Sequence, residues 1–198
     1  MRRQIPAAIR MIIVMTILTG VAYPFVVTGI ARVAFPSRAN GSFVSGNGRV
    51  VGSSLIGQSF SDASGNPLSQ YFQPRPSAAG QDGYDAMASG GSNLGPSNPK
   101  LLSAVAYRVA AYRALNRLQA SAPVPIDAVT ASGSGLDPDI SLANALDQAP
   151  RVARARSLQV AQVVALVKAH LRNRAWYFLG ENSVNVLELN LALDRMGS

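Results

Sequence analysis

The chain has 198 residues, a formal net charge of +8 and no cysteine, which excludes a disulfide framework and a thiolate metal site. Removing residues 1–34, with their four arginines, leaves 14 basic against 10 acidic side chains. These basic residues are spread along two predicted helices without a nucleic-acid-binding motif, so nucleic acid is not an expected partner.

Residues 11–31 carry no charged side chain, and Arg10 and Arg32 flank them directly. At about 1.5 Å per residue this run makes a helix of roughly 32 Å, enough to cross a hydrocarbon core of about 30 Å. The run is longer than the apolar part of a cleavable signal peptide, so it predicts an uncleaved anchor. Pro24 lies inside it and predicts a kink near residues 21–23.

The orientation of the anchor follows from the basic residues around it. Arg2, Arg3 and Arg10 precede the span, whereas Arg32 and Arg38 follow it. Because positive charge is enriched on the cytoplasmic side, we expect residues 1–10 in the cytoplasm. The chain is then single-pass, and residues 35–198 form one domain outside the cytoplasm.

Behind the anchor, residues 37–49 predict an irregular lead and residues 50–58 a strand. In residues 61–99, Gly, Pro, Ser and Asn occupy 21 of 39 positions, typical of a loop. Aromatic residues within this stretch favour an ordered, exposed loop rather than a flexible linker.

The rest of the chain predicts helices and one strand. Asn98 and Pro99 read as N-cap and first residue of a helix. Its apolar residues recur at steps of three and four and predict one buried stripe: Leu101, Val105, Val109, Tyr112, Leu115 and Leu118. We further expect helix starts at Asp137-Pro138 and Ser141, a break at residues 148–150, a restart at 151–156, and a helix over 158–171.

Residues 183–194 alternate apolar and polar side chains and predict a half-buried strand pairing with residues 50–58. Leu187, Leu189, Leu191 and Leu193 would form its buried face. The expected fold class is therefore α+β, with a small β-sheet covered by helices on one face.

The segment 127–138 leaves three interpretations open. Ser132 or Ser134 could be a nucleophile with His170, although no G-x-S-x-G pattern surrounds either serine. Asp137, Asp139 and Ser141 could form a cation loop, although the rest of an EF-hand pattern is missing. The default interpretation is a turn and helix cap that presents backbone groups to a partner or to the domain itself.

Six blocks of residues, in order along about 90 % of the chain, resemble the KdpC family, the C subunits of Kdp-type potassium-transporting ATPases. The blocks are residues 52–58, 71–78, 89–99, 129–138, 148–153 and 184–190. Two departures stand out: Asp139 occupies a position where the family usually has histidine, and Asn182-Ser183 stands where it usually has Pro-Arg.

The resemblance implies a non-catalytic accessory subunit of a bacterial inner-membrane complex that imports potassium at the expense of ATP. Its implied partners are the channel-like subunit KdpA, the P-type ATPase subunit KdpB, the small single-span subunit KdpF and the lipid bilayer. No cofactor is expected on the chain itself, because ATP and potassium act at the level of the complex. The family is described as a catalytic chaperone that raises the ATP affinity of KdpB, which from outside the membrane requires indirect coupling.

Nine residues of these motifs are candidate partner contacts: Gln58, Arg75, Ser92, Asn93, Ser132, Ser134, Asp137, Arg151 and Asn185. Arg75, held between two prolines, is the strongest candidate, either bridging to another subunit or stapling the 61–99 loop to its own domain. Two other functions stay open: a membrane-anchored serine hydrolase, and a module that binds anionic envelope polymer through its arginines.

Overall fold

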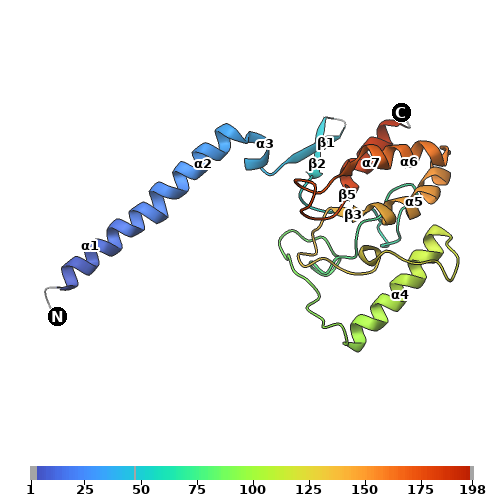
Figure 1. Cartoon of the computed structure of the whole chain (residues 1–198), viewed down its shortest axis with the longest axis horizontal. Coiled ribbons are helices and arrows are strands. Elements are labelled where there is room, and N and C mark those ends of the chain that lie inside the picture. The colour runs from blue at the N-terminus through green and yellow to red at the C-terminus, as the bar shows by residue number, and fades with distance from the viewer. Residues whose placement is uncertain (1–3, 47, 197–198) are drawn as a thin grey trace. The chain divides into compact units, whose positions relative to one another are not determined.

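The computed structural model describes residues 4–46 and 48–196. The chain divides into two compact units, residues 1–43 and residues 44–198 (Figure 1). Arg2 and Arg3, on which part of the orientation prediction depends, lie outside the described residues.

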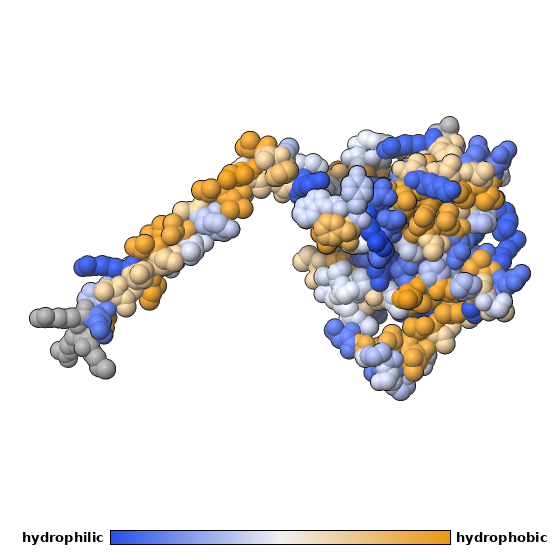
Figure 2. All heavy atoms as spheres, viewed as in Figure 1, coloured by the Kyte–Doolittle hydropathy of each residue, from blue (hydrophilic) through white to orange (hydrophobic). Residues whose placement is uncertain are grey.

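The first unit is built on one continuous helical run, Gln4–Ala34, of 31 residues with a mean hydropathy of 2.1. Its length and composition suffice to cross a membrane, and apolar residues cover most of it in Figure 2. The run comprises α1 (Gln4–Ile17), a π-helical segment η1 (Leu18–Ala22) and α2 (Tyr23–Ala34). The short helix α3 (Pro36–Ala39) follows.

The kink predicted near residues 21–23 falls at the end of the π-helical segment η1. The N–H of Tyr23 bonds the carbonyl of Leu18, five residues back, one position before Pro24. In a regular α-helix a proline ring clashes with the carbonyl four residues before it. The wider π turn just before Pro24 relieves that crowding within the apolar helix.

The second unit holds a three-stranded antiparallel sheet in the order β3-β5-β4. Its strands are β3 (Asp139–Ser141), β4 (Leu171–Arg172) and β5 (Ser183–Asn185). In the register, Val184 of the central strand lies opposite Ile140 on one side and Leu171 on the other. The helices are α4 (Pro99–Asn116), the 3-10 turn η2 (Ile126–Ala128), α5 (Leu142–Ala155), α6 (Val160–Ala169) and α7 (Val186–Met196).

The hydrophobic core lies between this sheet and helices α5, α6 and α7. Its fully buried members include Phe72, Ile140, Val152, Val163, Val184, Leu189 and Leu193. The expected α+β class is confirmed, with a small sheet and packed helices.

The predicted strand at residues 50–58 is shorter and pairs differently. β2 (Arg49–Ser53) pairs with β1 (Phe43–Gly46) in a separate two-stranded sheet, so the prediction of an irregular lead through residue 49 is wrong as well. Beyond Ser53 the chain leaves the strand in a turn, and the N–H of Gly57 bonds the carbonyl of Leu136 instead of a strand partner.

The predicted strand at residues 183–194 is wrong after Asn185, where α7 begins. The side-chain oxygen of Asn185 accepts a hydrogen bond of 3.0 Å from the N–H of Glu188 and so caps the first turn of this helix. Leu189 and Leu193 are fully buried, as predicted, but they are one helical turn apart on one face.

Three helix predictions also need correction. No helix starts at Asp137-Pro138, because β3 follows, and α5 begins after Ser141, whose hydroxyl accepts from the N–H of Asn144 at 3.1 Å. Pro150 does not break α5, which continues to Ala155 with Ala149 and Val152 fully buried. The helix predicted at 158–171 spans Val160–Ala169.

The start of α4 is confirmed, since the side chain of Asn98 accepts from the N–H of Lys100 at 2.9 Å. Its predicted stripe faces the protein but is only half-buried. The long stretch between β2 and α4 contains, among described residues, no helix or strand beyond an isolated bridge of Ser61 with Pro67. Most of this loop is exposed or half-buried, as expected, while Phe72 and Ala79 are fully buried and anchor it to the unit.

Candidate functional site

Two glycine-rich loops, residues 89–96 and 132–135, lie against one another in the second unit. The N–H of Gly90 donates to the carbonyl of Ser134 at 2.8 Å, and the hydroxyl of Ser89 donates to the same carbonyl at 3.1 Å. A Cβ on Gly135, whose φ is +68°, would lie 2.7 Å from the carbonyl oxygen of Gly90. Glycine is therefore required here by close backbone approach and by a left-handed conformation.

Ser92 and Asn93 follow directly after this contact and are exposed. Asn93 has a φ of 52°, a left-handed conformation that asparagine tolerates better than most residues. The loop contact thus fixes the base of a short polar segment whose tip faces solvent.

Arg75 joins this loop cluster through Asp137. Its Nη1 lies 2.8 Å from the carboxylate of Asp137, and the two side chains are 23% and 32% exposed. The hydroxyl of Tyr84 donates to the carbonyl of Arg75, and burial raises the pKa of Tyr84, with the charge of Asp137 adding to the effect. Asp137 also accepts from the N–H of Asp139, so its carboxylate orders the chain entering β3.

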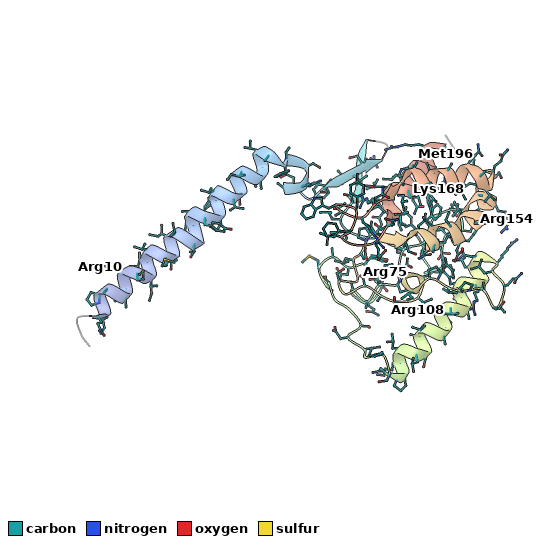
Figure 3. The ribbon with its side chains drawn as sticks, viewed as in Figure 1. Arg10, Arg75, Arg108, Arg154, Lys168 and Met196 are labelled. Carbon is teal, nitrogen blue, oxygen red and sulfur yellow. The ribbon has the colours of Figure 1, made fainter. Side chains whose placement is uncertain are left out.

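Arg75 lines three cavities, and the two larger ones meet at its side chain. The larger, of about 680 Å³, lies between the loop of residues 59–84 and α4 and is lined by Arg75, Tyr84, Arg108 and Tyr112 among others. The second, of about 630 Å³, is lined by Arg75, Asp137 and the 131–134 loop. Figure 3 shows Arg75 among the loops and Arg108 on α4.

Arg151 is 4% exposed and lines neither of the two larger cavities at Arg75. Its Nη1 donates to the carbonyls of Ser69 and Tyr71 at 2.6 and 3.0 Å, and its Nη2 donates to the side chain of Gln148 at 2.7 Å. Burial lowers its pKa to about 10, so it remains protonated near neutral pH. As placed, Arg151 holds the 61–99 loop against α5.

Two polar residues outside the nine candidates clamp the same loop. Gln148 donates to the carbonyl of Gln73 and accepts from its N–H, and Asn190 makes the same pair of bonds with Phe72. Both side chains are 1% exposed. The available sequence signal was a polar side chain within an otherwise apolar helix face, which suggests a buried hydrogen-bond partner.

Asn185 and Gln58 also lie within the unit. Asn185 is 1% exposed and donates to the carbonyl of Ser54 at 2.9 Å, joining β5 to the end of β2. Gln58 is half-buried, with its side-chain oxygen next to Gly52.

Two of the three residues that depart from the expected family pattern, Asp139 and Ser183, are bonded to each other. The hydroxyl of Ser183 donates to the carboxylate of Asp139 at 2.8 Å, and Asn185 donates to the other oxygen at 3.2 Å. Arg172 adds a contact of 3.5 Å to this carboxylate. An aspartate and a serine here form a short local bond, whereas a histidine and an arginine at these positions would repel when both are charged.

The serine and cation interpretations find few supporting contacts. The hydroxyls of Ser132 and Ser134 lie 3.4 Å apart, and Ser134 accepts from the N–H of Leu136. The Nδ1 atom of His170 bonds the carbonyl of Leu166 in α6, and among the described residues no hydrogen bond joins this ring to either serine. Within residues 4–46 and 48–196 no group of three or more acidic or histidine side chains could hold a metal ion.

A family model and the curated relatives of this chain point to the same protein family. The family described as "KdpC: K+-transporting ATPase, c chain" matches residues 5–195. The chain is 56% identical to the potassium-transporting ATPase KdpC subunits of Mycobacterium bovis and Mycobacterium tuberculosis, over 99% of this chain and all of theirs. It is 53% identical to the subunit of the same name from Methylibium petroleiphilum, over 98% of each chain. The chain therefore belongs to the KdpC family of potassium-transporting ATPase subunits.

Proposed function

We propose that this chain is the accessory, non-catalytic subunit of an ATP-driven potassium uptake complex and assembles with KdpA, KdpB and KdpF. The observation that carries the proposal is the family match from residue 5 to residue 195, which includes both the apolar helix and the second unit. A subunit that stabilises a complex needs preformed surface rather than reactive groups, and the loop cluster around Arg75 supplies fixed polar surface.

The helix of residues 11–31 spans the bacterial inner membrane in this proposal, with residues 1–10 in the cytoplasm and residues 35–198 outside. Support comes from the length and apolarity of the run Gln4–Ala34, of which no part is buried within the protein. Because ATP is cytoplasmic, the chain raises the ATP affinity of KdpB through coupling between distant sites and not by contact with the nucleotide.

Coupling between distant sites needs a segment that moves as a rigid body, and the backbone of the loop that carries Arg75 is held in place. Gln148, Asn190 and Arg151 each hold its backbone by two or more hydrogen bonds. A force on this loop from a neighbouring subunit would thus be transmitted to α5 and α7 instead of being absorbed by loop motion.

The test uses the complex with and without this chain. Affinity purification through a tag on this chain should bring down the channel-like and ATPase subunits together. Steady-state hydrolysis should show a higher KM for ATP when the chain is omitted, with a smaller change in kcat, because the proposed effect is on binding. Unchanged KM in a complex that still assembles would refute the chaperone role, and failure to copurify would refute the accessory role.

A serine-directed covalent probe separates the hydrolase alternative from this proposal. Ser132 and Ser134 have no histidine bonded to them among the described residues, so we expect no labelling at either serine. Labelling that is lost in Ser132→Ala or Ser134→Ala would establish chemistry in this chain and contradict the non-catalytic role.

A further inference from the structure

The turn between β4 and β5 exposes four consecutive large side chains. Trp176, Tyr177, Phe178 and Leu179 are 77%, 95%, 69% and 46% exposed. Single exposed apolar residues are common on protein surfaces, but a contiguous group of this kind marks a contact with another molecule.

This turn is ordered by its own backbone. Ala175 and Leu179 exchange two N–H to carbonyl bonds of 2.9 Å each, which closes the loop. Trp176 and Tyr177 adopt φ values of 51° and 69°, a left-handed conformation that costs about 1 kcal/mol or more for such residues. Glycine or asparagine would form the same turn without this cost, so the backbone of the turn alone gives no reason for aromatic side chains here.

The charges around the turn are paired. Arg174 lies 2.6 Å from Glu181, and Arg172 lies 2.8 Å from Glu188. Both arginine side chains are more than 40% exposed. Each of the two ion pairs near the turn therefore presents a positive and a negative group side by side to solvent. This arrangement complements a zwitterionic phospholipid headgroup, which carries a phosphate and an amine.

Exposed apolar residues also occur shortly after the apolar helix in the sequence. Val50 and Leu55, on and just after β2, are 61% and 60% exposed. The end of β2 lies next to β5, the strand that leaves the turn, because Asn185 donates to the carbonyl of Ser54 (Figure 1).

We propose that the turn of residues 175–179 inserts into the boundary between headgroups and hydrocarbon of a phospholipid bilayer; this rests on the proposed membrane anchor. Trp and Tyr concentrate at that boundary, because one end of each ring system is apolar and the other forms hydrogen bonds. The covalent link to an apolar helix brings a bilayer to this unit without any other protein. A five-residue turn is also small for a protein interface, which needs roughly 800 Å² per partner.

The single tryptophan of the chain, Trp176, reports on this contact directly. The full chain is placed in phosphatidylcholine vesicles without any other subunit. We expect its tryptophan emission to shift to the blue, to be quenched by bromine on the acyl chains, and to be protected from aqueous iodide. The effect should depend little on salt, since the flanking charges are paired.

Tyr177→Asp is the test variant, because aspartate tolerates a left-handed φ and Tyr177 packs against little. It should shift the emission of Trp176 to the red, abolish bromine quenching and leave the melting temperature unchanged. Tyr107→Asp is the matched control: Tyr107 is 76% exposed on α4, and its replacement should leave the emission in vesicles as in the unsubstituted chain.

Flotation of the vesicles separates the two proposals. If the chain floats with the vesicles but Trp176 stays open to iodide, the anchor holds and the insertion of the turn is refuted. If Trp176 becomes protected only when the other subunits are present, the turn contacts a subunit and the bilayer proposal is equally refuted. A chain that does not float refutes the anchor, and the insertion with it.

Discussion

At the residue scale, Arg75 shows how a motif residue can have a structural partner inside its own domain. The sequence left two roles open, and the ion pair with Asp137 is the contact that a loop staple requires. The bridge to another subunit stays a prediction, because one guanidinium has more donors than a single carboxylate uses.

Replacing Arg75 by alanine should lower the free energy of unfolding by about 1–2 kcal/mol, since a partly buried charged hydrogen bond is lost. For a unit of this size that is a fall in melting temperature of roughly 2–8 °C. Arg49→Ala, at an exposed position of β2, serves as the control and should leave the melting temperature unchanged. If Arg75→Ala melts like the control while copurification of the other subunits weakens, the arginine acts between subunits and the staple role is wrong.

Tyr84 gives a residue-scale prediction at alkaline pH. Burial raises its pKa above the usual value near 10, so the folded chain keeps a proton that the unfolded chain releases. The stability that depends on this proton is present below about pH 10 and is lost as the pH rises further. In a spectrophotometric titration of the chain against Tyr84→Phe, the difference signal should appear only with unfolding. A difference signal that titrates near pH 10 in a folded chain would contradict this.

At the scale of elements, the contact between the two glycine-rich loops depends on one position more than on its neighbour. Gly135→Ala would place a methyl group 2.7 Å from two backbone atoms at a positive φ, whereas an alanine at Gly133 meets nothing within 4 Å. We expect Gly135→Ala to cost about 1–3 kcal/mol in denaturant unfolding and Gly133→Ala to cost far less. Equal effects of the two substitutions would show that the loops are not held together in solution.

The predictions from sequence succeed where a local signal is unambiguous. The Asn98-Pro99 start of α4 is one such case, and the unbroken apolar run within Gln4–Ala34 is another. They fail where one pattern of apolar residues fits both the two-residue period of a strand and the 3.6-residue period of a helix. Residues 186–193 alternate like a strand, yet Val186, Leu189 and Leu193 also recur at helical spacing, and packing against the core selects the helix.

Other features were beyond local reasoning because they need contacts distant in sequence. Asn190 binds the backbone of Phe72 across 118 positions, and Gln148 binds Gln73 across 75. Pro150 likewise stays inside α5 because burial of that helix outweighs one missing hydrogen bond. Of the nine candidate residues, the sequence located the loop cluster through its glycines but not the buried positions of Arg151 and Asn185.

At the scale of the whole molecule, the proposed function requires the second unit to act from outside the cytoplasm. The arginine distribution supports this orientation, with Arg2, Arg3 and Arg10 before the apolar run against Arg32 and Arg38 close behind it. A phosphatase fused after Ser198, which is active only outside the cytoplasm, should therefore be active in cells. A reporter that works only in the cytoplasm should be inactive at the same site.

The asymmetry is small enough that charge changes can test it. Moving positive charge across the helix, with Arg10→Glu together with lysines at Ser37 and Ala39, should reduce phosphatase activity by inverting part of the population. The control Arg154→Glu changes one charge of the same sign more than 100 residues along the chain from the helix and should leave the activity as it was. An active cytoplasmic reporter in the unsubstituted chain would place the second unit beside ATP, and the argument for indirect coupling to KdpB would then fail.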